Sequence, residues 1–406
     1  MPRFHRARHR STAGFVVTQL LARRWCAMIF LACGFAFALV LPPLALPARP
    51  LARPMSATCR APLPLAALAE EVPAEHGPES SAPLLPALLR CAVEASACLA
   101  GYLVHVLVLS RRALPLLGRR VGLDTIVGLG VLAMVAQRGT ARTGHPLPAW
   151  VRSDSREEEA RSMLDLRALP QREKLALLGT ATLLLVAPIA FAFLSPLLEA
   201  LLYVFAALGL PMGEASLLGA RVLLEQTVVY VVLLKLLASR HAPFFRDGAW
   251  VRWRWRGAWA APVLGGYAAS VALFNLVEPL NQALWPHLEY MQEGMVAKLA
   301  NPPGKSLSAL LVGSLTPCVG APLYEEVQSR AFILQALTAV VPLRAAVVLS
   351  GVLFGIQHLQ LGLALPLSVT GAFWGALYVQ SGNLLVPVLV HALWNARIFL
   401  GSYLGL

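Results

Sequence analysis

Three short groups of polar residues interrupt the otherwise apolar sequence of the last quarter of the chain. In chain order they are Glu325, Glu326 and Arg330, then Phe354 and His358, then His391 and Asn395. A charged side chain at the centre of a bilayer costs roughly 2.5–3.5 kcal/mol on insertion scales, so such residues in apolar segments are candidates for function. A carboxylate can take a proton from water, an imidazole can bind a metal or transfer protons, and an amide can stabilise an oxyanion. The set therefore suits hydrolysis.

The spacing of the first group separates its two carboxylates. Glu326 and Arg330 are four residues apart, which places them on one face of a helix. Glu325 is rotated from that face by about 100° and can point into a different cavity. One carboxylate can thus have a structural role while the other takes part in catalysis.

The other two groups supply imidazoles and an amide. His391 and Asn395 are also four residues apart, so we expect both to project from one helix toward a common point. Glu325, His358 and His391 are expected on three separate helices around one cavity. Two histidines and a carboxylate also form a common catalytic zinc shell. The alternative is a buried ion pair with hydrogen-bonded core histidines, but three such groups within some seventy residues favour a functional site.

Other hydrolase motifs are absent from the sequence. It contains no H-E-x-x-H motif of zinc proteases and no G-x-S-x-G turn of serine hydrolases. None of its six cysteines forms a C-x-x-C pair, which argues against a zinc knuckle or a disulfide framework.

The elements that position these residues must lie in a membrane. Of the 406 residues, 57% are hydrophobic and 14% are charged, against about 25% charged in soluble proteins. We predict an all-α, polytopic transmembrane bundle of about eight helices after a targeting leader. Apolar windows occur at 86–109, 121–137, 175–209, 216–238, 257–277, 306–323, 326–341, 344–360, 363–380 and 384–403. The window 175–209 is too long for one crossing, and Pro188 and Pro196 are expected to kink or split it.

The chain is predicted to have three parts. Residues 1–80 are a targeting leader and flexible linker, 81–302 are membrane-embedded helices with polar loops, and 303–406 are the catalytic helix core. The net charge of +13 is concentrated in the leader, where nine arginines precede the first acidic residue, Glu70. This composition is typical of an organelle transit peptide and favours a plastid over the endoplasmic reticulum, with a retained membrane helix as the alternative.

A second basic segment bears on orientation. The loop 239–256 carries five arginines against one aspartate, so it is predicted to face the stroma or cytoplasm. Its continuation from Trp250 to Trp259 alternates Trp and Arg, which is typical of an anchor at the membrane interface.

The motif order E-E-x-x-x-R, F-x-x-x-H, H-x-x-x-N resembles the type II CAAX prenyl endopeptidase and bacteriocin-processing (CPBP) family of intramembrane proteases. The resemblance covers 303–406, and the runs APLYEEVQSRAF and LLVPVLVHALWNARIFLGSYLGL are similar to plant and algal plastid members. It implies that Glu326 and Arg330 orient the catalytic groups. The sequence departs from the family pattern at Ser329 and Ala331, which bears on the shape of the substrate pocket.

The resemblance also implies roles for the remaining polar residues. Glu325 would activate water with His358 as its partner, and His391 with Asn395 would form the oxyanion and ligand-side pair. The same four residues would bind zinc if the water is activated by a metal, and either scheme uses this set. No other cofactor is expected.

The leading hypothesis is a multi-pass plastid membrane endopeptidase of the CAAX prenyl protease 2-like type, with the endoplasmic reticulum membrane as the alternative location. Its expected partners are membrane lipid and a membrane-associated protein or peptide substrate, and no nucleic acid. A second hypothesis is a non-proteolytic membrane scaffold or chaperone with the same fold. A third is a proton-relaying transporter, which no internal inverted repeat supports.

Overall fold

The computed structural model describes residues 84–116, 119–143, 164, 166–191, 193, 195–208, 214–241, 244–245, 250–255, 258–286 and 295–405. The predicted leader and linker at 1–80 lie outside this part of the chain.

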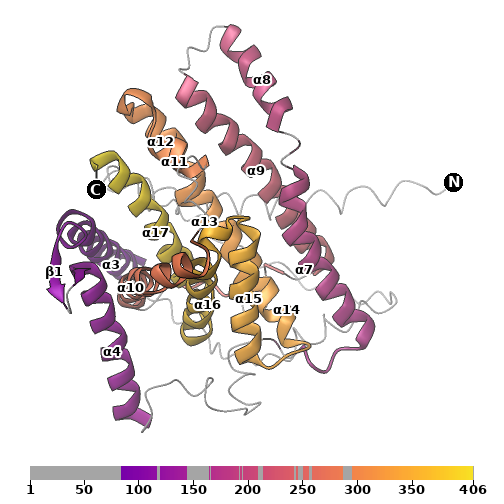
Figure 1. Ribbon diagram of the computed structural model, residues 1–406. Helices are drawn as coiled ribbons and strands as arrows, with labels where there is room; N and C mark the ends of the chain where they lie inside the picture. The colour runs from indigo at the N-terminus through magenta and orange to yellow at the C-terminus, as the bar shows by residue number, and fades with distance from the viewer. Residues whose placement is uncertain are drawn as a thin grey trace. The chain divides into compact units, whose positions relative to one another are not determined.

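The described part is almost entirely helical, which confirms the predicted all-α class (Figure 1). The first half contains α3 (Leu84–Val104), η2 (His105–Leu109), β1 (Ala113–Leu116), β2 (Arg119–Gly122), α4 (Leu123–Thr143), α7 (Gln171–Phe191), α8 (Ser195–Ala207), α9 (Glu214–Arg240) and α10 (Ala260–Leu284). The second half contains α11 (Met295–Ala300), η4 (Pro303–Lys305), α12 (Leu307–Leu315), η5 (Thr316–Gly320), α13 (Ala321–Glu326), η6 (Val327–Leu334), α14 (Gln335–Thr338), α15 (Leu343–Gln357), η7 (Leu361–Leu363), α16 (Ala364–Ser381) and α17 (Leu385–Leu404). The strands β1 and β2 form a short antiparallel hairpin in which Ala113 pairs with Gly122.

Several helices are long and apolar enough to cross a membrane. In the described residues these spans are Leu88–Leu109, Ser216–Arg240, Ala260–Leu284, Leu307–Thr338 and Leu385–Leu404. At 1.5 Å rise per residue, about 20 residues cross a 30 Å hydrocarbon layer. The chain is therefore a multi-pass membrane protein.

One predicted boundary is wrong. We expected separate segments at 306–323 and 326–341, but Leu307–Thr338 is a single helical run. The adjacent carboxylates Glu325 and Glu326 resemble a polar break between two spans, yet the helix continues through them. The prediction that 175–209 would split is confirmed, because α7 ends at Phe191 and α8 begins at Ser195, one residue before Pro196.

The helix α17 lies among the elements that carry the polar groups. It contacts α10, α13, α16 and η5, and α15 packs along α16 (Figure 1). A Cβ atom at Gly351 would overlap the backbone of Ala372, and one at Gly355 would overlap Ser368. Because only glycine permits this approach, α15 and α16 lie close together and the end of α15 is held in place.

The Trp-rich segment packs into the protein. Trp250 and Trp259 are each only 3% exposed, whereas Trp253 and Trp255 between them are partly exposed, and the predicted interfacial position stays a prediction. The backbone carbonyl of Arg252 accepts a hydrogen bond from Leu384 N at 2.7 Å, and Asn383 Nδ2 donates to the Arg254 carbonyl at 2.8 Å. The segment thus ties the start of α17 to the rest of the bundle.

Candidate active site

Both carboxylates of the first group lie on a short α-helical stretch between two π-helical ones. The helix α13 holds Glu325 and Glu326, with η5 before it and η6 after it. π-Helical turns shift the register of side chains along a helix and are frequent at functional sites. The polar residues are thus carried by the least regular part of the longest span.

Glu326 is fully engaged in a buried network. Its Oε2 lies 3.0 Å from Arg330 Nε, and both side chains are completely buried. Its Oε1 lies 3.1 Å from His391 Nδ1 on α17. This confirms that Glu326 and Arg330 share one helix face, and it places the charge of Glu326 between two cationic or hydrogen-donating partners.

Aromatic rings and a backbone carbonyl enclose this network. The Arg330 guanidinium lies 4.7 Å from the centre of the Phe354 ring, and its Nη2 donates to the Gly371 carbonyl at 3.2 Å. The ring centres of Trp374 and His391 are 4.5 Å apart. Because every side of the network is packed, Glu326 and Arg330 hold the site together and are not placed to meet a substrate.

Glu325 lies in a different environment. Its Oε2 is 3.8 Å from His358 Nε2, and the two side chains are 20% and 28% exposed. Among the described residues this buried Oε2 atom has no hydrogen-bond partner. The Oε2 atom of Glu326 also accepts no hydrogen bond, but it forms the 3.0 Å ion pair with Arg330 in a fully buried position. Of the two adjacent carboxylates, the partly exposed Glu325 is therefore the one that water can reach.

The orientation of His358 follows from its position just after α15. Its Nδ1 lies 2.7 Å from the backbone carbonyl of Phe354, one turn earlier. A carbonyl only accepts, so Nδ1 carries the proton and Nε2 presents a lone pair toward Glu325 when the ring is neutral. The lone pair of His358 and the carboxylate of Glu325 thus face the same small space.

Asn395 has a partner that its spacing did not suggest. Its Nδ2 donates to the backbone carbonyl of Pro317 in η5 at 2.6 Å. In the π-helical register this carbonyl would pair with the residue five positions later, which is Pro322 and has no N–H. Asn395 supplies the missing donor, while His391, one turn earlier on α17, bonds to Glu326.

Two contacts of the site were not identified from the sequence. Gln328 Nε2 donates to Gln357 Oε1 at 3.1 Å, which joins η6 to the residue before His358. Tyr230 of α9 stacks on Tyr324, with ring centres 4.2 Å apart, directly beside Glu325. The two glutamines are polar residues in apolar windows, a signal available in the sequence, but nothing in the spacing links Tyr230 to the motifs.

The arrangement does not match a three-ligand zinc shell. Within the described part of the chain, no three side chains of His, Cys, Asp or Glu gather around a position where one metal ion could bind. Glu325 and His358 provide two ligands, while His391 and Asn395 are bonded to Glu326 and Pro317. Zinc binding stays a prediction, which metal analysis of the purified protein tests.

A second buried polar cluster lies on other helices. His105 at the start of η2 lies 2.8 Å from the Tyr267 hydroxyl and 3.8 Å from the Asp124 carboxylate. Asp124 also accepts from Thr125 N at 2.7 Å and lies 3.4 Å from Arg397 Nη2. This Asp124 cluster joins η2, α4 and α10 to α17.

Comparison with known proteins yields a match over the segment that carries the three motifs. Residues 307–397 match the family model of type II CAAX prenyl endopeptidase Rce1-like proteins. No curated protein and no solved structure matches the chain. The match contains every predicted site residue and lies within the predicted catalytic core, so this segment is similar to CPBP membrane proteases, as the motifs predicted.

Proposed function

We propose that this protein is an intramembrane endopeptidase in which Glu325 activates water beside His358. The observation that carries the proposal is the contrast between two adjacent carboxylates. Glu326 is fully buried and pairs with Arg330 and His391, whereas Glu325 is partly exposed and its Oε2 faces the lone pair of His358. A general base needs an acceptor atom within reach of a water molecule.

The proposed reaction is hydrolysis of a peptide bond. A water molecule bound by Glu325 and His358 attacks the scissile carbonyl carbon and gives one proton to the Glu325 carboxylate. The electron pair of the carbonyl moves to its oxygen, where the second Nδ2 hydrogen of Asn395 and the Nε2–H of a doubly protonated His391 ring stabilise the charge. When the tetrahedral intermediate collapses, the C–N bond breaks and the proton on Glu325 passes to the leaving amine.

The proposed substrate class rests on the surroundings of the site, and the proposed location rests on the composition of the amino terminus. The site lies in a membrane-spanning helix, so a membrane-associated protein or peptide is the proposed substrate. The acid-free, Arg-rich amino terminus supports a plastid membrane as the proposed location, with the endoplasmic reticulum as the alternative.

Removal of the proposed base tests the mechanism. Glu325→Gln keeps the shape of the side chain but cannot accept a proton, so we expect cleavage to fall by roughly 10²–10⁴-fold. His358→Ala should also lower cleavage strongly, while both variants keep the wild-type unfolding temperature in micelles. The measurement is cleavage of a membrane-anchored reporter peptide by purified protein in lipid nanodiscs.

Glu278→Gln is the matched control, because Glu278 lies on α10 and bonds to Gln282 outside the motifs. Full cleavage by Glu325→Gln would contradict the proposal. Specific partner binding by the wild type without any cleavage of its partners would instead support the scaffold alternative.

A further inference from the structure

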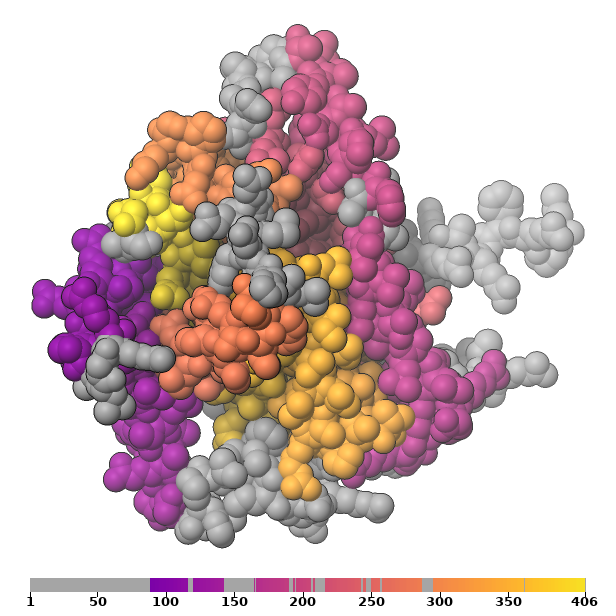
Figure 2. Space-filling view, viewed as in Figure 1, coloured from indigo at the N-terminus to yellow at the C-terminus, as the bar shows by residue number. Residues whose placement is uncertain are grey.

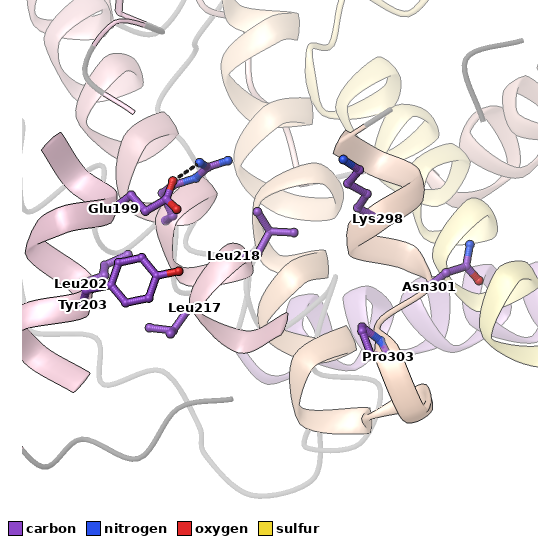
Figure 3. Close-up of a pocket in the computed structure, with 9 residues that line it drawn as sticks. Glu199, Leu202, Tyr203, Leu217, Leu218, Lys298, Asn301 and Pro303 are labelled. Carbon is purple, nitrogen blue, oxygen red and sulfur yellow. Dashed lines mark hydrogen bonds and ion pairs between the residues drawn. The ribbon is translucent and has the colours of Figure 1, made fainter. Parts of the chain in front are cut away.

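A cavity of about 330 Å³ lies among α8, α9 and α11, and none of the motif residues lines it. Figure 3 shows Glu199 and Tyr203 on one wall, Lys298 and Asn301 on the other, and Leu218 between them. The volume is at the lower end of the roughly 300–1,000 Å³ of ligand sites. It accommodates a small polar group and the beginning of a chain.

The charged groups of the cavity favour an anion. Arg221 Nη1 lies 2.6 Å from Glu199 Oε2, and the Arg221 side chain is only 16% exposed. Its Nε is buried and has no hydrogen-bond partner among the described residues. Among the described residues, Lys298 has no acidic partner. The cavity is thus lined by two cations, Arg221 and Lys298, and one carboxylate, Glu199. A single additional anionic group would balance the lining.

The position of the cavity near the ends of two membrane spans indicates the depth in the membrane at which the anion binds. Arg221 lies within the first two turns of the span Ser216–Arg240, and Lys298 lies shortly before the span Leu307–Thr338 begins. The ends of a membrane span lie near the level where the hydrocarbon layer meets the lipid headgroups. The anionic groups present at that level in every membrane are those of lipids.

The apolar part of the lining supports the same occupant. Leu202, Leu217 and Leu218 border the charged groups, so the cavity is amphipathic. The neighbouring α8 has 13 residues, which span about 20 Å and fall short of a 30 Å hydrocarbon layer. Its apolar side chains are nevertheless exposed, with Leu197 at 67%, and α8 lies open on the face seen in Figure 2. Lipid chains are the occupants that cover such a surface.

We propose that this cavity binds the headgroup of an anionic membrane lipid. Arg221 and Lys298 contact the anionic group, and the adjoining leucines contact the first carbons of its chains. Basic pockets between membrane helices bind anionic headgroups by this combination of charge and apolar contact. The lipid would hold α8, α9 and α11 together at a site separate from the peptidase chemistry.

Lipid titration of the full-length protein tests the proposal. Purified protein in mixed micelles is titrated with phosphatidylglycerol or phosphatidylcholine, and bound lipid is measured by native mass spectrometry. We expect a preference for phosphatidylglycerol that falls about fivefold in Lys298→Gln and further in Lys298→Gln/Arg221→Gln, because each basic residue contributes about a factor of five. Because Lys298 is exposed, we expect the variant Lys298→Gln to fold like the wild type.

Arg240→Gln is the matched control, because Arg240 is an exposed arginine at the opposite end of α9. Equal binding of the two lipids, an unchanged preference in Lys298→Gln, or an equal loss in Arg240→Gln would each overturn the proposal. Displacement of the lipid by millimolar inorganic phosphate would identify a site for free phosphate and would overturn it as well. The assay does not depend on peptide cleavage, so its outcome is independent of the proposed peptidase activity.

Discussion

Two buried polar clusters in this protein contain similar residues, but only one of them has a carboxylate beyond the one that pairs with its arginine. The site around Arg330 contains two carboxylates, two histidines and an arginine, and the Asp124 cluster contains one carboxylate, one histidine and an arginine. Each includes residues of π-helical segments, η6 in the first and η2 in the second. Helix irregularity and buried charge are therefore common to both.

The two clusters differ in the number of carboxylates that they contain for one arginine. Asp124 is the single carboxylate of its cluster, and it is bonded to Thr125 and paired with Arg397. In the other cluster Glu326 balances Arg330, so Glu325 is additional and faces His358 with partial exposure. A buried polar cluster can do chemistry when one group is left over after the charges are balanced and that group can meet water.

The largest effect on stability is expected when the buried pair loses its cation. Arg330→Met leaves the fully buried Glu326 charge without its arginine, which typically costs about 3–5 kcal/mol. The measurement is the free energy of unfolding by denaturant in micelles. The double variant Arg330→Met/Glu326→Leu should recover a large part of the loss, because no uncompensated charge remains. A double variant no more stable than the single one would show that the pair is not the source of the effect.

A smaller loss is expected at the bond between α17 and η5. Asn395→Ala leaves the Pro317 carbonyl without its side-chain donor, and a buried unsatisfied acceptor costs about 1–3 kcal/mol. Thermal unfolding in micelles, alongside cleavage of the reporter peptide per folded molecule, separates this loss from a catalytic one. Reduced cleavage with unchanged unfolding would assign Asn395 to the chemistry alone.

The smallest effect is expected in the Asp124 cluster. Arg397→Met removes a cation that is 25% exposed and 3.4 Å from Asp124, and partly exposed pairs contribute up to about 1 kcal/mol. Cleavage of the reporter peptide should stay within about twofold of the wild type, because Asp124 is bonded to Thr125 and the cluster contains none of the motif residues. A loss of cleavage comparable to that of Glu325→Gln would show that the two clusters are coupled and would contradict the comparison.

Much of the fold could be predicted because membrane helices consist of long apolar runs, which are recognisable in the sequence. The windows for α9, α15, α16 and α17 agree with the helices within a few residues, whereas α10 continues to Leu284, beyond its window 257–277. The run Leu307–Thr338 was divided wrongly, since composition does not distinguish a loop from a polar patch buried in the bundle. The contacts of the Trp-rich segment with Asn383 and Leu384 could not be predicted either, because they join residues far apart in the sequence.

The sequence by itself determined which residue types are available for catalysis and which of them share a helix face. It placed Glu326 with Arg330 and set Glu325 apart, because side-chain direction along a helix depends only on spacing. Only the tertiary structure decided that His391 pairs with Glu326, that His358 faces Glu325, and that Asn395 reaches Pro317. These contacts join residues on different helices, whose relative placement depends on packing such as that of Gly351 against α16 and not on the local order of residues.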